Sequence, residues 1–97
     1  MQIKQETIGS NGRFYIEEDN NTLAEMVYHF TDKTTFLITH TEVDESLAGK
    51  GVGRQLADAA VDYARKYSFM IKATCPFAKK VLDRSTEFAD VYNAEKK

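Results

Sequence analysis

Apolar and polar residues alternate with a period of two through the first half of the chain. Successive side chains of a β-strand point to opposite faces of a sheet, so this alternation indicates strands with one buried face. Clusters of Gly, Asn and Asp, which tolerate the backbone of tight turns, separate four such segments. The expected strands are Ile3–Ile8, Arg13–Glu18, Leu23–Thr31 and Thr34–Val43. Together they predict an antiparallel meander.

The period changes to three and four residues after the fourth segment. The apolar residues that follow this spacing are Val52, Leu56, Ala59, Ala60, Tyr63, Ala64 and Tyr67. They predict an amphipathic helix of about four turns, Val52–Tyr67, with Tyr63 and Tyr67 in the core. A short apolar strand, Phe69–Thr74, follows, and Pro76 suits the first position of a second helix because its missing N–H is not needed there.

This order of elements predicts a single domain of the α/β (α+β) class over the whole chain. The crossover from one strand through a helix to the next strand should be right-handed, which makes the last two strands parallel. We therefore expect a mixed, mostly antiparallel sheet, a long helix after a Gly-rich loop and a short helix after Cys75. In the tail, Phe88, Val91 and Tyr92 are expected to dock, whereas Ala94–Lys97 is expected to fray.

The composition narrows the classes of function. The 97 residues are 42% apolar and 29% charged, as in globular proteins, and the net charge of −2 argues against a nucleic-acid partner. No run reaches the roughly 18 apolar residues of a transmembrane helix, and Met1–Glu6 lacks the apolar core of a signal peptide. One cysteine, Cys75, cannot form an internal disulfide, which favours the cytoplasm. An exposed sheet edge leaves a monomer and a weak homodimer both open.

A glycine-rich segment lies between the fourth strand and the long helix. It contains Gly49, Gly51 and Gly53 at every second position, with Lys50 and Arg54 beside them. Such a backbone can curl around a ligand, and the free N–H groups at a helix N-terminus attract anions. The segment therefore predicts a phosphate-binding loop.

Two common phosphate-binding motifs do not match this loop. A P-loop requires G-x-x-x-x-G-K-[ST], but Asp44 stands in place of the first Gly and neither Ser nor Thr follows Lys50. The dinucleotide motif G-x-G-x-x-G requires a third Gly where Arg54 stands. The spacing excludes both readings.

The run Val43–Leu56 instead resembles the acetyl-CoA pyrophosphate loop of the GCN5-related N-acetyltransferases. The family pattern [RQ]-x-x-G-x-[GA] follows a strand and precedes a helix. Gly51 and Gly53 occupy its two small positions, while Ala48 replaces the usual Arg or Gln. The resemblance extends over Phe36–Val81. In this range the chain is similar to the small, single-domain YjdJ/NATD1-type branch of the family. It implies acetyl-CoA or coenzyme A as the cofactor.

The same resemblance implies where the cofactor would lie. The pyrophosphate would contact Gly49, Lys50, Gly51, Val52, Gly53 and Arg54. Main-chain groups of Thr41, Glu42 and Val43 would hold the pantetheine arm, in the gap where this strand parts from the next parallel strand. Cys75 ends that neighbouring strand and would lie across the gap.

Cys75 is open to three interpretations. It is a small buried apolar residue, an acid that protonates the departing CoA thiolate, or a nucleophile that accepts the acetyl group and passes it on. Pro76 places this cysteine at a helix N-terminus, where the helix dipole lowers a thiol pKa. The position therefore suits the two chemical roles.

Glu42 and His40 are candidate general bases, His40 directly and Glu42 through a water molecule. Two residues apart on one strand, they are expected to share a face with Phe36 and Ile38 and to extend an apolar stripe. The alternative is a core His40 bonded to the backbone and a solvated Glu42. The sequence offers no cluster with metal-ligand spacing, so no metal is expected.

These expectations describe a small acetyl-CoA-dependent N-acetyltransferase whose acceptor is an unidentified small-molecule or peptide amine. The alternatives are a CoA-binding module that transfers nothing and an interaction domain with an empty loop. The family usually carries two helices between its first strands that help to form the acceptor site. Here Ile8–Leu23 offers only turns and one strand, which favours the binding module.

Overall fold

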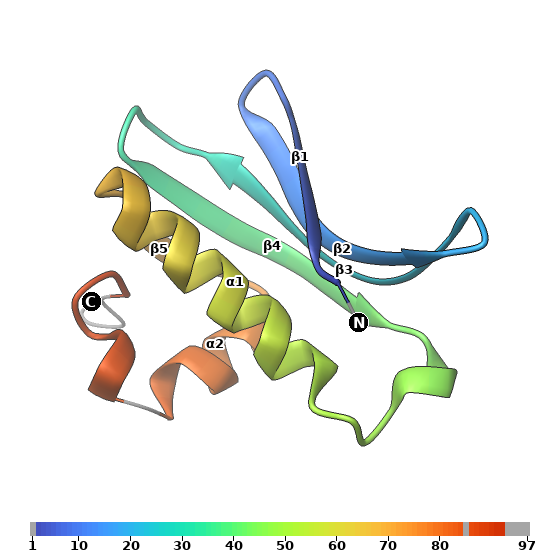
Figure 1. Cartoon of the computed structure of the whole chain (residues 1–97). Helices are drawn as coiled ribbons and strands as arrows, with labels where there is room; N and C mark the ends of the chain where they lie inside the picture. The colour runs from blue at the N-terminus through green and yellow to red at the C-terminus, as the bar shows by residue number, and fades with distance from the viewer. Residues whose placement is uncertain (1, 85, 93–97) are drawn as a thin grey trace.

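The computed structural model describes residues 2–84 and 86–92. Figure 1 shows a curved sheet with two helices beneath it. The strands are β1 (Lys4–Ile8), β2 (Asn11–Glu18), β3 (Asn21–Phe30), β4 (Thr35–Val43) and β5 (Met70–Ala73). The α-helices are α1 (Val52–Tyr67) and α2 (Pro76–Asp83), and two short 3₁₀ helices are η1 (Glu45–Leu47) and η2 (Thr86–Phe88).

The sheet has the order β1-β2-β3-β4-β5. The first four strands are antiparallel neighbours, and β5 pairs in parallel with β4 after the α1 crossover. The turn between β2 and β3 holds Asp19 and Asn20 at positive φ (52° and 68°), which these two residue types tolerate better than most. The predicted mixed, mostly antiparallel α/β fold is confirmed.

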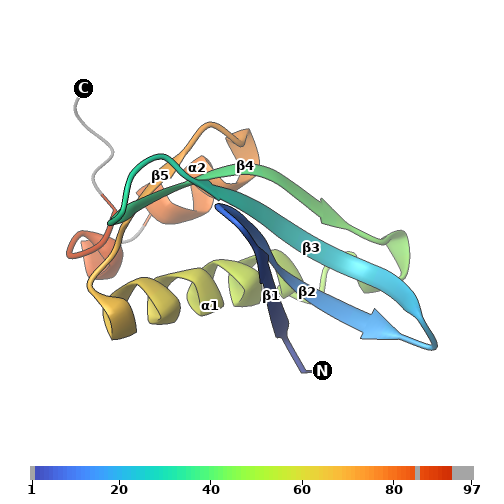
Figure 2. The ribbon, with the colours of Figure 1, turned by 90° about the horizontal axis from the view of Figure 1, so that it is seen from above.

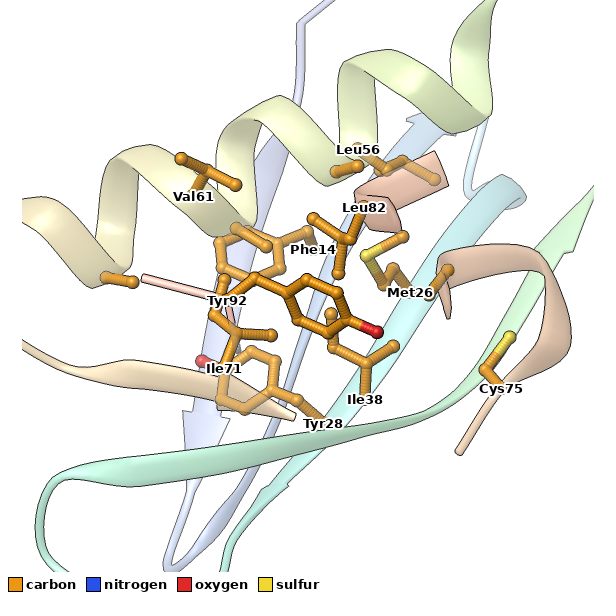
Figure 3. Packing of buried hydrophobic residues seen from close by; sticks show 14 of the residues in the cluster. Phe14, Met26, Tyr28, Ile38, Leu56, Val61, Ile71, Cys75, Leu82 and Tyr92 are labelled. Atoms are coloured by element: carbon orange, nitrogen blue, oxygen red, sulfur yellow. The ribbon is translucent and has the colours of Figure 1, made fainter. Parts of the chain in front are cut away.

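Both α-helices pack on the same face of the sheet, where they share one core. Helix α1 lies along strands β2 to β5, and α2 contacts α1, β4 and β5 (Figure 2). An aromatic cluster forms the centre, with Tyr28 4.9 Å from Phe36 and 5.2 Å from Phe14 between ring centroids. Figure 3 shows Leu56, Leu82 and other apolar side chains converging on it.

The prediction that Tyr67 belongs to the core is wrong. Tyr67 is 53% exposed, whereas Tyr63 is packed against the core. Tyr67 is the last residue of α1, and its ring stacks on Phe69 at 5.8 Å instead of entering the cluster.

The tail docks as predicted up to Tyr92. Val91 accepts a backbone hydrogen bond from Ile71 of β5 (2.7 Å), and Phe88, Val91 and Tyr92 are buried. Arg65 of α1 binds the Asp90 carboxylate at 2.8 Å and holds this segment from outside. The predicted fraying of Ala94–Lys97 concerns residues outside the described ranges. Over the described ranges, neither helix has the length and apolar character needed to cross a membrane.

Candidate active site

Strand β4 contains a bulge that reverses which side chains face the core. Val27 of β3 pairs with His40, but the next residue, Tyr28, pairs with Ile38, so Thr39 is an extra residue in β4. Before the bulge Phe36 and Ile38 are buried. After the bulge the odd-numbered residues, beginning with Thr41, turn inward.

The bulge makes one prediction wrong. His40 and Glu42 do not share a face with Phe36 and Ile38, but lie exposed on the opposite face of the sheet. Their side chains are 58% and 71% exposed, with His40 Nε2 3.8 Å from Glu42 Oε1. The core-histidine interpretation is therefore also wrong, whereas a solvated Glu42 agrees with the structure.

The glycine-rich loop begins with a capped turn. Asp44 accepts hydrogen bonds from the Ser46 backbone N–H (2.9 Å) and hydroxyl (2.6 Å), and these bonds lower the pKa of the Asp44 carboxyl. Leu47 of η1 inserts into the core. The turn is thereby anchored before the chain reaches the glycines.

Helix α1 starts at Gly51 without a side-chain cap. Gly51 is left-handed (φ 71°, ψ 20°), as is Gly49 (φ 78°). The first helical hydrogen bond runs from Gln55 N–H to the Gly51 carbonyl, so the earlier N–H groups of this turn lack intrahelical partners. A Cβ on either glycine would enter open space. This open, uncapped terminus fits an anionic phosphate group.

Gly53 has a different role from the other two glycines. A Cβ at Gly53 would lie 2.1 Å from Cζ of Phe77, the second residue of α2. The missing side chain lets the starts of α1 and α2 pack closely. The family pattern marks position 53 as small, but the reason, packing between two helices, is visible only in the structure.

The two cations expected at the loop differ in their surroundings. Lys50 is exposed. Arg54 donates to Asp58 (3.1 Å) and to Glu87 (2.6 Å), and its guanidinium lies 4.9 Å from the centre of the Phe88 ring. Arg54 thus links α1 to η2, and the backbone N–H groups are the better candidate phosphate donors.

Strands β4 and β5 separate beyond Ile38. Their pairing ends with Ile38 opposite Ala73, and the N–H groups of Thr74 and Cys75 both donate to the Ile38 carbonyl at 3.0 and 3.2 Å. From there β4 continues paired with β3 on its other side, through Thr41–Val43. The predicted gap between the parallel strands therefore starts beside Cys75.

Cys75 is 6% exposed and is the N-cap residue of α2. Figure 3 places it at the rim of the core cluster, next to β4. Its Sγ lies 3.3 Å from Oγ1 of Thr41. Burial raises the pKa of the Cys75 thiol, but hydrogen bonding between the sulfur and the Thr41 hydroxyl and the backbone of Ala78, Phe77 and Thr41 outweighs this effect, so the pKa lies below its usual value.

Glu25 is a residue that the sequence analysis missed. It faces Glu42 across the β3–β4 ladder, and one ligand atom each of Glu25, His40 and Glu42 lie within 4.8 Å of one another. Glu25 already binds Arg13 at 2.9 Å. Exposed acidic groups commonly converge without a metal, so we assign none. Only the register between the strands could have indicated this cluster.

Comparison with known proteins agrees with this geometry. The sequence model of the GCN5-related N-acetyl-transferase family matches residues 13–91. The chain belongs to the GCN5-related N-acetyltransferase family. It is 32% identical over 57 residues to Protein NATD1 of Xenopus tropicalis, a match that spans 59% of this chain and 52% of that relative. The aligned part is thus about half the length of the curated relative.

Solved structures show the same family fold. A GCN5-like protein from Staphylococcus aureus has a TM-score of 0.77 and 38% identity, over 98% of this chain and 90% of that one. A predicted acetyltransferase from Clostridium acetobutylicum, solved with acetyl-CoA, has a TM-score of 0.60 and 17% identity, over 77% and 56% of the two chains. The second likeness supports the fold alone.

Proposed function

We propose that this chain is an acetyl-CoA-dependent N-acetyltransferase that acts on an amine. The observation that carries the proposal is the uncapped, glycine-led N-terminus of α1 beside the gap between β4 and β5. The first feature suits a pyrophosphate and the second suits an extended arm with main-chain hydrogen-bonding groups. Family membership supports acyl transfer, and a protein of the same fold from Clostridium acetobutylicum has been solved with acetyl-CoA.

Each part of the proposed cofactor site has its own residues. The backbone N–H groups between Gly49 and Arg54 would bind the pyrophosphate, apart from the Lys50 N–H, which donates to the Leu47 carbonyl (3.3 Å). The Lys50 side chain would add positive charge. The main chain of Thr41–Val43 would hold the pantetheine arm. When bound, acetyl-CoA supplies an acetyl thioester and a thiolate leaving group.

Cys75 is the proposed reactive group. Its thiol either gives its proton to the departing thiolate, or its thiolate attacks the acetyl carbonyl, so that an S–C bond forms at Sγ as the thioester bond to CoA breaks. In the second route the amine then takes the acetyl group and releases the Cys75 thiolate. A pKa below the usual value raises the thiolate fraction that the second route requires.

The exposed face of the sheet is the proposed side from which the acceptor approaches. There Glu42 or His40 would accept the proton that the amine loses. The residues that line a hollow of about 350 Å³ include the carboxylates Glu25, Glu42, Asp44 and Glu45. These negative charges favour a cationic amine over a neutral one. We further propose that the protein acts without a nucleic-acid partner, as a monomer or a weak homodimer. The free thiol of Cys75 favours a cytoplasmic location.

Titration of isotope-labelled protein with acetyl-CoA tests the cofactor site. We expect amide shifts at residues 49–54 and 41–43, and little change at the β1–β2 turn. The absence of shifts in the first two segments would overturn the proposal and leave an interaction domain. Mass spectrometry of the same samples would detect an acetyl group on Cys75.

Substitution of Cys75 tests the chemistry. Cys75→Ala should keep acetyl-CoA binding and lower acetyl transfer by about 100-fold or more, the usual scale for a lost acid–base group. Turnover equal to that of the unsubstituted protein would remove Cys75 from the mechanism.

A CoA-binding module without transfer is the second candidate function. It is favoured by the two-residue connection, Gly9-Ser10, between β1 and β2, where the family usually places helices that form the acceptor site. Assays with a panel of cationic and neutral amines and N-terminal peptides distinguish the two. Tight acetyl-CoA binding with no turnover of any acceptor would support the module.

A further inference from the structure

The bulge in β4 brings the Thr41 side chain into contact with Cys75. Without the extra residue at Thr39, the strand alternation would place position 41 on the exposed face, together with Leu37. Instead Thr41 is half-buried, and its Oγ1 lies 3.3 Å from the Cys75 Sγ. This distance is within hydrogen-bonding range for sulfur, which is larger than oxygen.

The described surroundings of Cys75 contain mainly neutral donors. The backbone at Phe77 and Ala78, in the first turn of α2, faces the sulfur along with the Thr41 side chain. The titratable neighbours on β4, His40 and Glu42, lie on the opposite face of the sheet. The charged residues of β5 and α2 are Lys72, Lys79, Lys80 and Asp83, all exposed. The Thr41 hydroxyl is therefore the side-chain group that acts on the Cys75 thiol most directly.

The geometry points to a positioning role for Thr41: its hydroxyl orients the Cys75 sulfur and stabilises the thiolate at the β4–β5 gap. The catalytic part of this inference rests on the proposed function, whereas the contact between Thr41 and Cys75 can be tested without it. A hydroxyl has one O–H donor and two acceptor lone pairs. It can therefore accept from the Cys75 S–H and, after rotation, donate to the thiolate, so it serves an acid and a nucleophile alike.

The direct test measures the pH dependence of thiolate ultraviolet absorbance, with the Cys75→Ala protein as the blank. Absorbance is chosen because the buried sulfur need not be reached by a reagent. Thr41→Val keeps the shape and removes the hydroxyl, and should raise the thiol pKa by about one unit, which lowers the thiolate fraction about tenfold at a pH well below the pKa. Thr41→Ser keeps the hydroxyl and should titrate close to the unsubstituted protein.

The matched control is Thr39→Val, which makes the same change at the exposed bulge position of the same strand. It should leave the Cys75 titration unchanged. If Thr41→Val does not fold, as judged by circular dichroism, Thr41→Ala provides the same measurement without the added methyl. A Cys75 pKa equal to that of the unsubstituted protein in whichever folded variant lacks the hydroxyl would overturn the inference.

Kinetics separate this inference from the proposed function. By the nucleophilic route, Thr41→Val should lower acetyl transfer about tenfold at neutral pH, and Thr41→Ser should restore the rate. If the unsubstituted protein transfers no acetyl group, the proposed function fails but the titration still decides the Thr41–Cys75 contact. If transfer occurs and the titration does not move, the positioning role fails and the function stands.

Discussion

Gly51 offers the sharpest test of the proposed phosphate site, because a substitution there should affect stability and acetyl-CoA affinity for two different reasons. Gly51 is in the left-handed region (φ 71°), and a Cβ there would meet no atom within 4 Å. Gly51→Ala therefore adds backbone strain without a clash. Gly9, in the turn between β1 and β2, has the same two properties (φ 61°, nothing within 4 Å) at the opposite end of the molecule (Figure 1).

The strain alone predicts similar losses of stability at the two positions. A residue with a Cβ pays about 1–2 kcal/mol in the left-handed region, so both alanine variants should lower the free energy of unfolding by that amount. Only Gly51 also lies in the proposed phosphate cradle. Alanine keeps the backbone N–H, but its Cβ would occupy the open space that the phosphate needs and hold the phosphate away from one donor. Losing one hydrogen bond to a charged phosphate costs about 1.5–3 kcal/mol, so Gly51→Ala should weaken acetyl-CoA binding about tenfold or more.

Urea unfolding and calorimetric titration with acetyl-CoA measure the two effects on the same samples. Gly9→Ala should lose stability and keep full affinity, whereas Gly51→Ala should lose both. Equal acetyl-CoA affinities of the two variants would refute the placement of the phosphate at this turn. Unequal losses of stability would refute the assignment of the stability cost to left-handed strain.

Two further predictions concern stability. Gly12→Ala should lower the free energy of unfolding by about 1–3 kcal/mol, since its Cβ would lie 2.4 Å from the ring of the fully buried Tyr28; an unchanged urea midpoint would contradict this. Asp90→Asn should destabilise the protein near neutral pH. The hydrogen bond and charge of Arg65 keep the pKa of Asp90 below its unfolded value, so the carboxylate contributes stability above the unfolded pKa of about 4 and loses it as pH falls through the lower folded pKa. The stability difference between Asp90→Asn and the unsubstituted protein should accordingly shrink in acid, and a difference independent of pH would contradict the reasoning.

Features that depend on nearby residues could be predicted from the sequence. The bounds of α1 match the predicted Val52–Tyr67, because the apolar spacing of a helix is repeated over several turns. The left-handed turn at Asp19 and Asn20 and the glycine turn before α1 were likewise visible, since specific residue types tolerate those backbone angles. The glycine-rich loop also carried the resemblance to the family, and the match of the family model over residues 13–91 confirms it.

The arrangement of the candidate site was decided by tertiary structure. A bulge is a property of two paired strands, and the extra residue at Thr39 turned Thr41 toward Cys75 and moved His40 and Glu42 to the other face. Alternation along one strand cannot reveal where the pairing slips. In the same way Gly53 is explained only by Phe77, from a helix that begins 23 residues later in the chain, counting from 53 to 76. The sequence by itself thus determined the elements and the glycine-rich loop, whereas contacts between distant segments decided which side chains meet at the gap.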